Sequence, residues 1–117
     1  MTPLADLRFE ALDRVVVARL EGEIDMSNAS ELGTAITARV PSDALAVVLD
    51  LGAVDYLDSA GIHIVFELRE RLTRRGQEMR LVVAPDSLIA AAIEYAGVAG
   101  TIETAETVQD AIADLGD

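Results

Sequence analysis

Ser59 and His63 are the two residues of this sequence that most resemble a catalytic pair. They lie four positions apart in a segment with helical spacing of apolar residues, and side chains four apart on a helix share a face. A hydrolytic serine also needs a third group that orients the base and donors that hold an oxyanion. The sequence shows neither beside this pair, so we favour an ordinary polar helix face over an enzyme.

Other enzymatic chemistry is limited by composition. The chain has 117 residues, with 21 acidic and nine basic groups and a net charge of −12, and every basic residue is an arginine. Without lysine there is no Walker-type phosphate lysine and no Schiff base. Without cysteine and with one histidine, a metal site is not expected, nor is a cofactor. The acidic charge argues against nucleic acid as a partner.

A second kind of chemistry is offered by the Asp58-Ser59 pair. It follows an apolar strand and opens a helix, where backbone amides and the helix dipole favour an anion. Gly61 permits close packing below it. Ser59 is thus predicted to be exposed at a helix start, although Asp58 or Ser59 acting only as an N-cap is the alternative.

The elements that position this pair follow from hydrophobic periodicity. Strands are predicted at 8–12 and 15–20, joined by a tight hairpin turn at Asp13-Arg14, and further strands at 45–51, 79–84 and 101–103. Helices are predicted at 27–40, 58–75, 85–96 and 105–115, with Ser27 or Asn28 as the first N-cap and Gly76 and Gly97 as C-caps. The pattern predicts a single α/β domain over residues 1–117 with a mostly parallel mixed sheet. No membrane insertion is expected, and we expect a cytoplasmic protein.

A response-regulator receiver domain is the nearest rival fold, since Asp50, Asp55 and Asp58 invite comparison with a phospho-accepting aspartate. Receivers carry an acidic pair after the first strand and a lysine after the fifth. The acidic pair is missing and the chain holds no lysine, so composition excludes this class.

Two motifs at a characteristic separation change the interpretation of Asp58-Ser59. Gly22-Glu23-Ile24-Asp25 precedes the apolar strand, and Leu57-Asp58-Ser59-Ala60-Gly61-Ile62 follows it. Together, over nearly the whole chain, they resemble the STAS domain of bacterial anti-sigma factor antagonists. The resemblance implies the STAS fold, in which an N-terminal hairpin is followed by β-α repeats.

The resemblance also implies a phosphorylation switch. Ser59 matches the residue that an anti-sigma factor, itself an ATP-dependent serine kinase, phosphorylates, so ATP would be bound by the partner. The unphosphorylated antagonist binds the anti-sigma factor and frees the sigma factor, and the phosphorylated form lets go. Asp58 matches the acidic neighbour and Asp25 the acid at the end of the second strand. The alternative within the family is a STAS subunit of a larger assembly, such as a transporter component or a signalling scaffold.

The predicted partner-binding surface surrounds this serine. Ala60 replaces a second Ser or Thr common in the family, and His63 stands where Gly is frequent. We expect Ile62, His63 and Phe66 to face the partner, although Ile62 and Phe66 could instead be buried under a neighbouring helix. A homodimer is left open by the sequence. The predicted partner-binding residues are Asp25, Asp58, Ser59, Ala60, Gly61, Ile62, His63 and Phe66.

Overall fold

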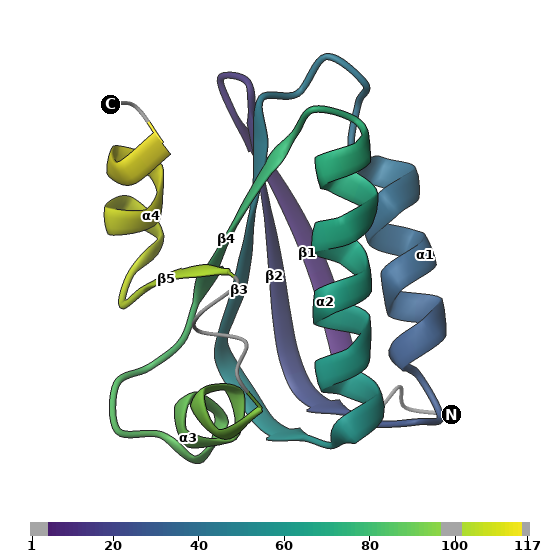
Figure 1. Cartoon of the computed structure of the whole chain (residues 1–117), viewed down its shortest axis with the longest axis vertical. Coiled ribbons are helices and arrows are strands. Elements are labelled where there is room, and N and C mark those ends of the chain that lie inside the picture. The colour runs from purple at the N-terminus through teal and green to yellow at the C-terminus, as the bar shows by residue number, and fades with distance from the viewer. Residues whose placement is uncertain (1–4, 97–101, 116–117) are drawn as a thin grey trace.

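A five-stranded sheet organises the protein, as a computed structural model describing residues 5–96 and 102–115 shows (Figure 1). The sheet order follows the chain, β1-β2-β3-β4-β5, with β1 and β2 antiparallel and the other pairs parallel. The predicted α/β fold with a mostly parallel mixed sheet is therefore confirmed. The elements are β1 (Ala5–Leu12), β2 (Val15–Ile24), α1 (Ala29–Arg39), β3 (Ala46–Leu57), α2 (Ser59–Arg74), β4 (Glu78–Val82), α3 (Leu88–Tyr95), β5 (Glu103–Ala105) and α4 (Val108–Leu115).

The opening hairpin has the predicted two-residue turn. Leu12 pairs with Val15, so Asp13 and Arg14 form the loop. Asp13 adopts a φ of 60°, a left-handed conformation that aspartate tolerates better than most residues. The hairpin places β1 at one edge of the sheet.

The third strand is longer than the sequence predicted. The apolar run ends at Leu51, but β3 continues to Leu57, paired with β2 through register shifts near Gly22. Pairing with a neighbouring strand here outweighs the low strand propensity of glycine and aspartate in this stretch. As a result β2 and β3 end side by side, with Ile24 opposite Leu57.

The C-terminal elements are shifted from their predicted positions. The last strand was expected at 101–103 but β5 is Glu103–Ala105, and α4 begins at Val108 instead of at residue 105. Thr107 explains the later start, because its Oγ1 accepts a hydrogen bond from the backbone N–H of Asp110 at 3.0 Å. The predicted Gly97 cap lies outside the described residues. Gly76 follows α2 with a φ of 73°, as expected for a helix-ending glycine.

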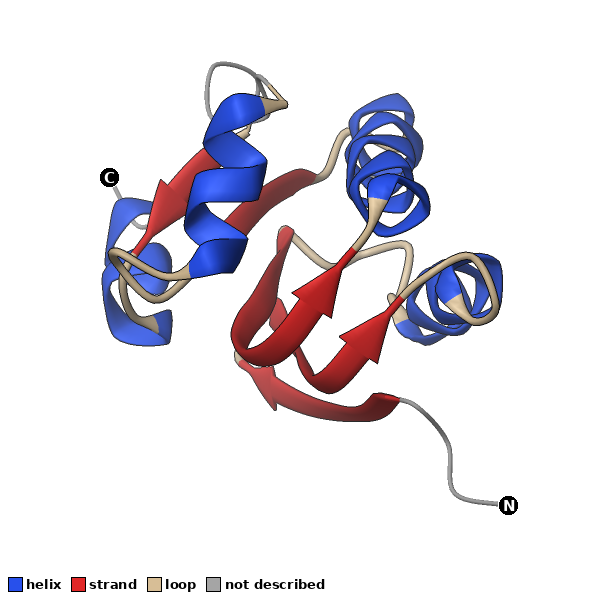
Figure 2. Cartoon of the chain, turned by 90° about the horizontal axis from the view of Figure 1, so that it is seen from below, coloured by secondary structure: helices blue, strands red, loops and turns tan. Residues whose placement is uncertain are grey.

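The two faces of the sheet are covered differently. Helices α1, α2 and α3 pack over one face and α4 packs over the other (Figure 2). The larger core holds fully buried side chains from β2, β3 and the three helices, such as Leu49, Leu68 and Ile93. The smaller core joins Val17 and Val48 to Ala111 of α4. This packing fixes the ends of β2 and β3, from which the candidate site is built.

Candidate functional site

Asp58 is the N-cap of α2, one of the two capping residues that the sequence offered. Its Oδ1 accepts a hydrogen bond from the backbone N–H of Gly61 at 2.9 Å. Its Oδ2 accepts one from the backbone N–H of Met26 at 3.1 Å. One carboxylate thus starts α2 and also anchors the loop between β2 and α1.

Ser59 is the first residue of α2 and is exposed. The helix start below it is held against the ends of β2 and β3 because Gly61 has no side chain. A Cβ on Gly61 would overlap Cδ1 of Leu57 and would lie 3.1 Å from Cγ2 of Ile24. Gly61 is accordingly buried, and its contribution to the site is this close packing.

Asp25 follows β2 directly and orders the loop beside Asp58. Its Oδ1 accepts hydrogen bonds from the backbone N–H of Ser27, at 2.8 Å, and from the Ser27 hydroxyl. Both hydrogen bonds lower the pKa of Asp25 below its ordinary value, and the one from the Ser27 hydroxyl has the larger effect. Asn28 holds the N-cap position of α1 but uses its side chain elsewhere, accepting from the backbone N–H of Asp25 at 3.0 Å.

Side chains at every fourth position of α2 form a row along one face of the helix. The row consists of Ser59, His63, Glu67 and Arg71. Nε2 of His63 lies 3.7 Å from Oε2 of Glu67, and Nη2 of Arg71 lies 2.7 Å from Oε1 of Glu67. Nη1 of Arg71 also donates to the Thr37 hydroxyl of α1, at 3.2 Å. The row therefore connects the exposed start of α2 to α1.

A shallow pocket of about 380 Å³ lies between this row and the start of α1. Ser59 and His63 both line it, and the His63 side chain is 78% exposed. The opposite wall is formed by uncharged residues at the start of α1 and the loop before it. These are Met26, Ala29 and Ser30.

Ile62 and Phe66 are half-buried and pack against the larger core, as does Ala60. This intermediate burial leaves part of each side chain accessible. Their place in a partner-facing patch stays a prediction, as does the alternative that they serve the fold alone. The structure does bring them onto the same helix as Ser59 and His63.

Two large apolar side chains near this site were missed by the sequence analysis. Met26 is 83% exposed and lines the pocket beside Ser59. Tyr56, one residue before the end of β3, is 51% exposed. An apolar residue directly after the Gly22-Glu23-Ile24-Asp25 motif was the available signal for Met26.

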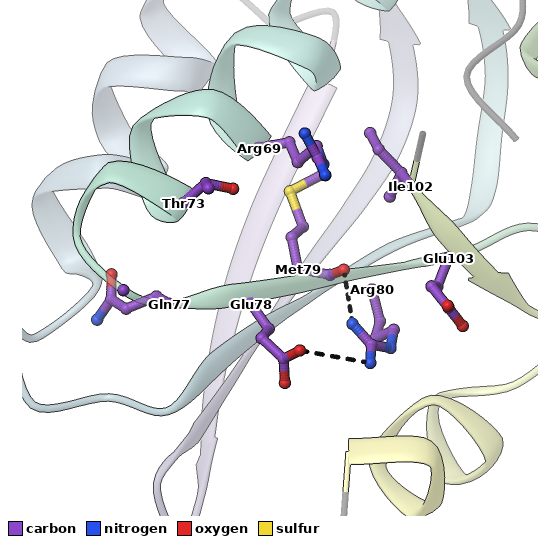
Figure 3. Close-up of a pocket in the computed structure, with 9 residues that line it drawn as sticks. Arg69, Thr73, Gln77, Glu78, Met79, Arg80, Ile102 and Glu103 are labelled. Atoms are coloured by element: carbon purple, nitrogen blue, oxygen red, sulfur yellow. Dashed lines mark hydrogen bonds and ion pairs between the residues drawn. The ribbon is translucent and has the colours of Figure 1, made fainter. Parts of the chain in front are cut away.

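A larger pocket of about 450 Å³ lies beside the C-terminal half of α2 and the start of β4 (Figure 3). It includes none of the predicted site residues. Arg80 in its wall is paired with Asp114 of α4 at 2.7 Å and with Glu78 at 3.8 Å. Nearby, Nη2 of Arg75 donates to the Val40 carbonyl at 3.0 Å. These arginines thus make structural contacts.

Two further sequence expectations concern metals and membranes. Within residues 5–96 and 102–115, no three histidine or acidic side chains gather as metal ligands would. In the same described part of the chain, none of the helices is long and apolar enough to span a bilayer.

Family membership follows from comparison with known proteins. The family model described as STAS domain matches residues 6–111, so the chain belongs to the STAS domain family. Its relatives are named for a regulatory role. RsfB of Mycobacterium tuberculosis, an anti-sigma-F factor antagonist, is 34% identical over 99 residues, which are 84% of this chain and 79% of that protein.

Two further likenesses agree with this. BtrV of Bordetella bronchiseptica is 33% identical over 75 residues, so the match spans 64% of this chain and 65% of that protein. The crystal structure of an anti-sigma factor antagonist from Mycobacterium paratuberculosis superimposes with a TM-score of 0.86 at 31% identity, over 97% of this chain and 95% of that one. The fold is therefore shared with a protein of that description along almost its full length.

Proposed function

We propose that this chain is an anti-sigma factor antagonist that acts in the cytoplasm by binding and not by catalysis. Unphosphorylated, it binds an anti-sigma factor that is also a serine kinase, and thereby frees a sigma factor. Phosphorylation of Ser59 by that kinase, which binds the ATP, releases the antagonist. The observation that carries this proposal is an exposed serine on a helix start that is positioned by the hydrogen bonds of Asp58 and the close packing at Gly61.

The switch is electrostatic on this proposal. A phosphoserine carries about −1.5 to −2 charges at pH 7. The carboxylate of Asp58 already occupies the capping position of α2, and the lowered pKa of Asp25 keeps a second negative charge nearby. An added phosphate therefore strengthens a negative field, and it repels a docked surface whose contacts were formed with a neutral hydroxyl. The helix itself does not need to change shape.

The proposed partner surface is the one predicted from the sequence, and its members act in two ways. Asp58 and Gly61 position the serine, while Ser59 and His63 are exposed for contact. Ala60, Ile62 and Phe66 supply half-buried apolar surface, and Asp25 supplies charge. Met26 adds an exposed apolar side chain in the pocket beside Ser59, of the kind that often anchors an interface. The partner should therefore present an apolar surface opposite Met26.

Calorimetric titration of the cognate anti-sigma factor tests the proposal. Ser59→Ala should bind in the presence of ATP with the affinity of the unmodified chain, because it loses one exposed hydroxyl and cannot be phosphorylated. Chain carrying phosphoserine at position 59 should bind at least about tenfold more weakly, a difference of about 1.4 kcal/mol.

Ser59→Asp should show a smaller loss, because aspartate carries less charge than phosphoserine. Ser30→Ala, which removes another exposed hydroxyl from the same pocket, is the matched control and should bind normally. Equal affinity of the phosphorylated and unmodified chains would contradict the proposed function.

A further inference from the structure

His63 stands one helical turn after Ser59 and is only loosely held where it is. Its imidazole lies 3.7 Å from Glu67, beyond hydrogen-bond distance, and its side chain is 78% exposed. Side chains of a helix lean toward its N-terminus, so a residue at position i+4 leans toward residue i. His63 is therefore placed to reach a group attached to the Ser59 oxygen.

A phosphate on Ser59 would find few other cations within reach. Of the described residues that line this pocket, His63 and Arg71 are the basic ones. Arg71 lies two turns farther along α2 and is engaged by Glu67 and by the Thr37 hydroxyl. The backbone N–H of Gly61, at the N-terminus of α2, already donates a hydrogen bond to Asp58. The wall across the pocket, formed by Met26, Ala29 and Ser30, carries no charge.

We propose that His63 is the intramolecular counter-ion of phosphorylated Ser59. The His63 side chain would move away from Glu67 and contact the phosphate. This inference rests on the proposed function, because it concerns the phosphorylated state of the same serine. A dianionic phosphate attracts an imidazolium more strongly than one carboxylate does at a similar distance. His63 would thus contact the phosphate directly.

Movement of His63 from Glu67 to the phosphate leaves the Glu67 carboxylate with an ion-pair partner. When His63 turns away, Glu67 keeps its 2.7 Å ion pair with Arg71. Arg71 in turn keeps its hydrogen bond to Thr37 of α1. The contacts among Glu67, Arg71 and Thr37 therefore stay intact. Only the His63 side chain has to move for the contact with the phosphate to form.

This contact makes the negative charge at the site depend on pH. Among the described residues that line the pocket, the charged groups around His63 are Glu67 and Arg71 on its own helix, while the facing wall from α1 and the loop before it is uncharged. Asp58 precedes the acceptor serine. Imidazole takes up a proton between about pH 5 and 8, the range in which phosphate also loses its second proton, near pH 6. An imidazolium beside the phosphate favours the dianion, so the second proton of the phosphate should be lost at a lower pH than it is without His63.

Phosphorus NMR of the full chain carrying phosphoserine at position 59 tests the inference. The phosphoserine can be incorporated during synthesis, so that no kinase is needed. The midpoint of the phosphate titration should lie at least about 0.3 pH units lower in the native sequence than in His63→Gln. Arg74→Gln, which removes an exposed cation from the far end of α2, is the control and should leave the midpoint unchanged.

The same samples separate this inference from the proposed function. Identical midpoints in the native sequence and in His63→Gln would overturn the contact between His63 and the phosphate, whatever the anti-sigma factor binds. A lower native midpoint supports that contact even if the anti-sigma factor binds the phosphorylated and unmodified chains equally. Equal binding would count against the proposed function alone.

Discussion

Asp58 shows how one residue can fix the position of an exposed acceptor. Both of its carboxylate oxygens accept backbone hydrogen bonds, one from Gly61 in its own helix and one from Met26 across the β2–α1 loop. The residue next to Ser59 is therefore committed to structure, while Ser59 stays exposed. An acidic residue at this place both holds the serine and adds the charge that a phosphate would reinforce.

Replacement of Asp58 should destabilise the fold. Asp58→Ala loses the N-cap of α2 and leaves the Met26 N–H without its partner, so the free energy of unfolding should fall by about 1–3 kcal/mol. Urea denaturation followed by circular dichroism measures this. Asp55→Ala, which removes an exposed carboxylate three residues earlier, should change it by less than about 0.5 kcal/mol. Equal effects of the two variants would refute the bridging role of Asp58.

Asp25 should contribute a pH-dependent part of the stability. The Ser27 hydroxyl and N–H lower its folded-state pKa below the ordinary 3.8, so the ionised carboxylate stabilises the fold above the unfolded pKa. This contribution is lost as the pH falls through the folded pKa. Ser27→Ala should move the pKa of Asp25 back toward 3.8, as carbon NMR of its carboxyl group would show.

The stability profile gives a second readout of the same pair. Between about pH 5 and pH 2, the native chain should lose more stability than Ser27→Ala, because only the native chain has the full hydrogen-bonded carboxylate to protonate. Ser30→Ala, an exposed serine on the adjoining helix, should follow the native curve. Native and Ser27→Ala curves of the same shape would argue against the assigned hydrogen bonds.

At the scale of elements, the site exists because β2 and β3 end at the same level. Ile24 pairs with Leu57, and the backbone N–H of Asp58 donates to the Ile24 carbonyl at 3.2 Å. The two loops that follow these strands are thereby brought together, one bearing Asp25 and the other Asp58. Helix α2 then starts directly against the strand ends because Gly61 is small.

Gly61→Ala should test this close approach. The added methyl group would overlap Leu57 and press on Ile24, so α2 must shift and the free energy of unfolding should fall by about 1–3 kcal/mol. In Gly52→Ala the new methyl would meet only the Asp50 carboxylate at 3.1 Å, on the exposed side of β3, which makes it the matched control. Thermal unfolding of both variants measures the difference, and a Gly61→Ala midpoint equal to the native one would contradict the packing role.

Local sequence signals predicted some elements well and others poorly, for identifiable reasons. The hairpin at Asp13-Arg14 and helix α2 have strong turn, cap and periodicity signals, and both are confirmed. The second half of β3 was missed because its pairing with β2 comes from tertiary contact, which a window of residues does not contain. The parts of the site that depend on tertiary contacts were missed for the same reason. Ser59 was located from its motif, whereas the exposure of Met26 depends on how the β2–α1 loop folds back on Asp58.

The two ends of the molecule differ in their charged residues. The hairpin and the C-terminal ends of α1 and α2 lie together at one end (Figure 1), where four arginines are interspersed with Asp13, Asp43 and Glu78. Ser59 lies at the opposite end with Asp25 and Asp58, and the net charge of the chain is −12. A phosphate on Ser59 would increase the negative charge at this end.

Mass spectrometry of the kinase reaction identifies the residue that accepts the phosphate. The chain is incubated with the cognate anti-sigma factor and ATP, and cleavage after Arg39 and Arg69 releases peptide 40–69, whose hydroxyl-bearing residues are Ser42, Tyr56 and Ser59. Fragment ions between Tyr56 and Ser59 locate the phosphate. We predict one phosphate, on Ser59, and none in Ser59→Ala. Phosphate on another residue with Ser59 unmodified would contradict the assignment of Ser59 as the switch.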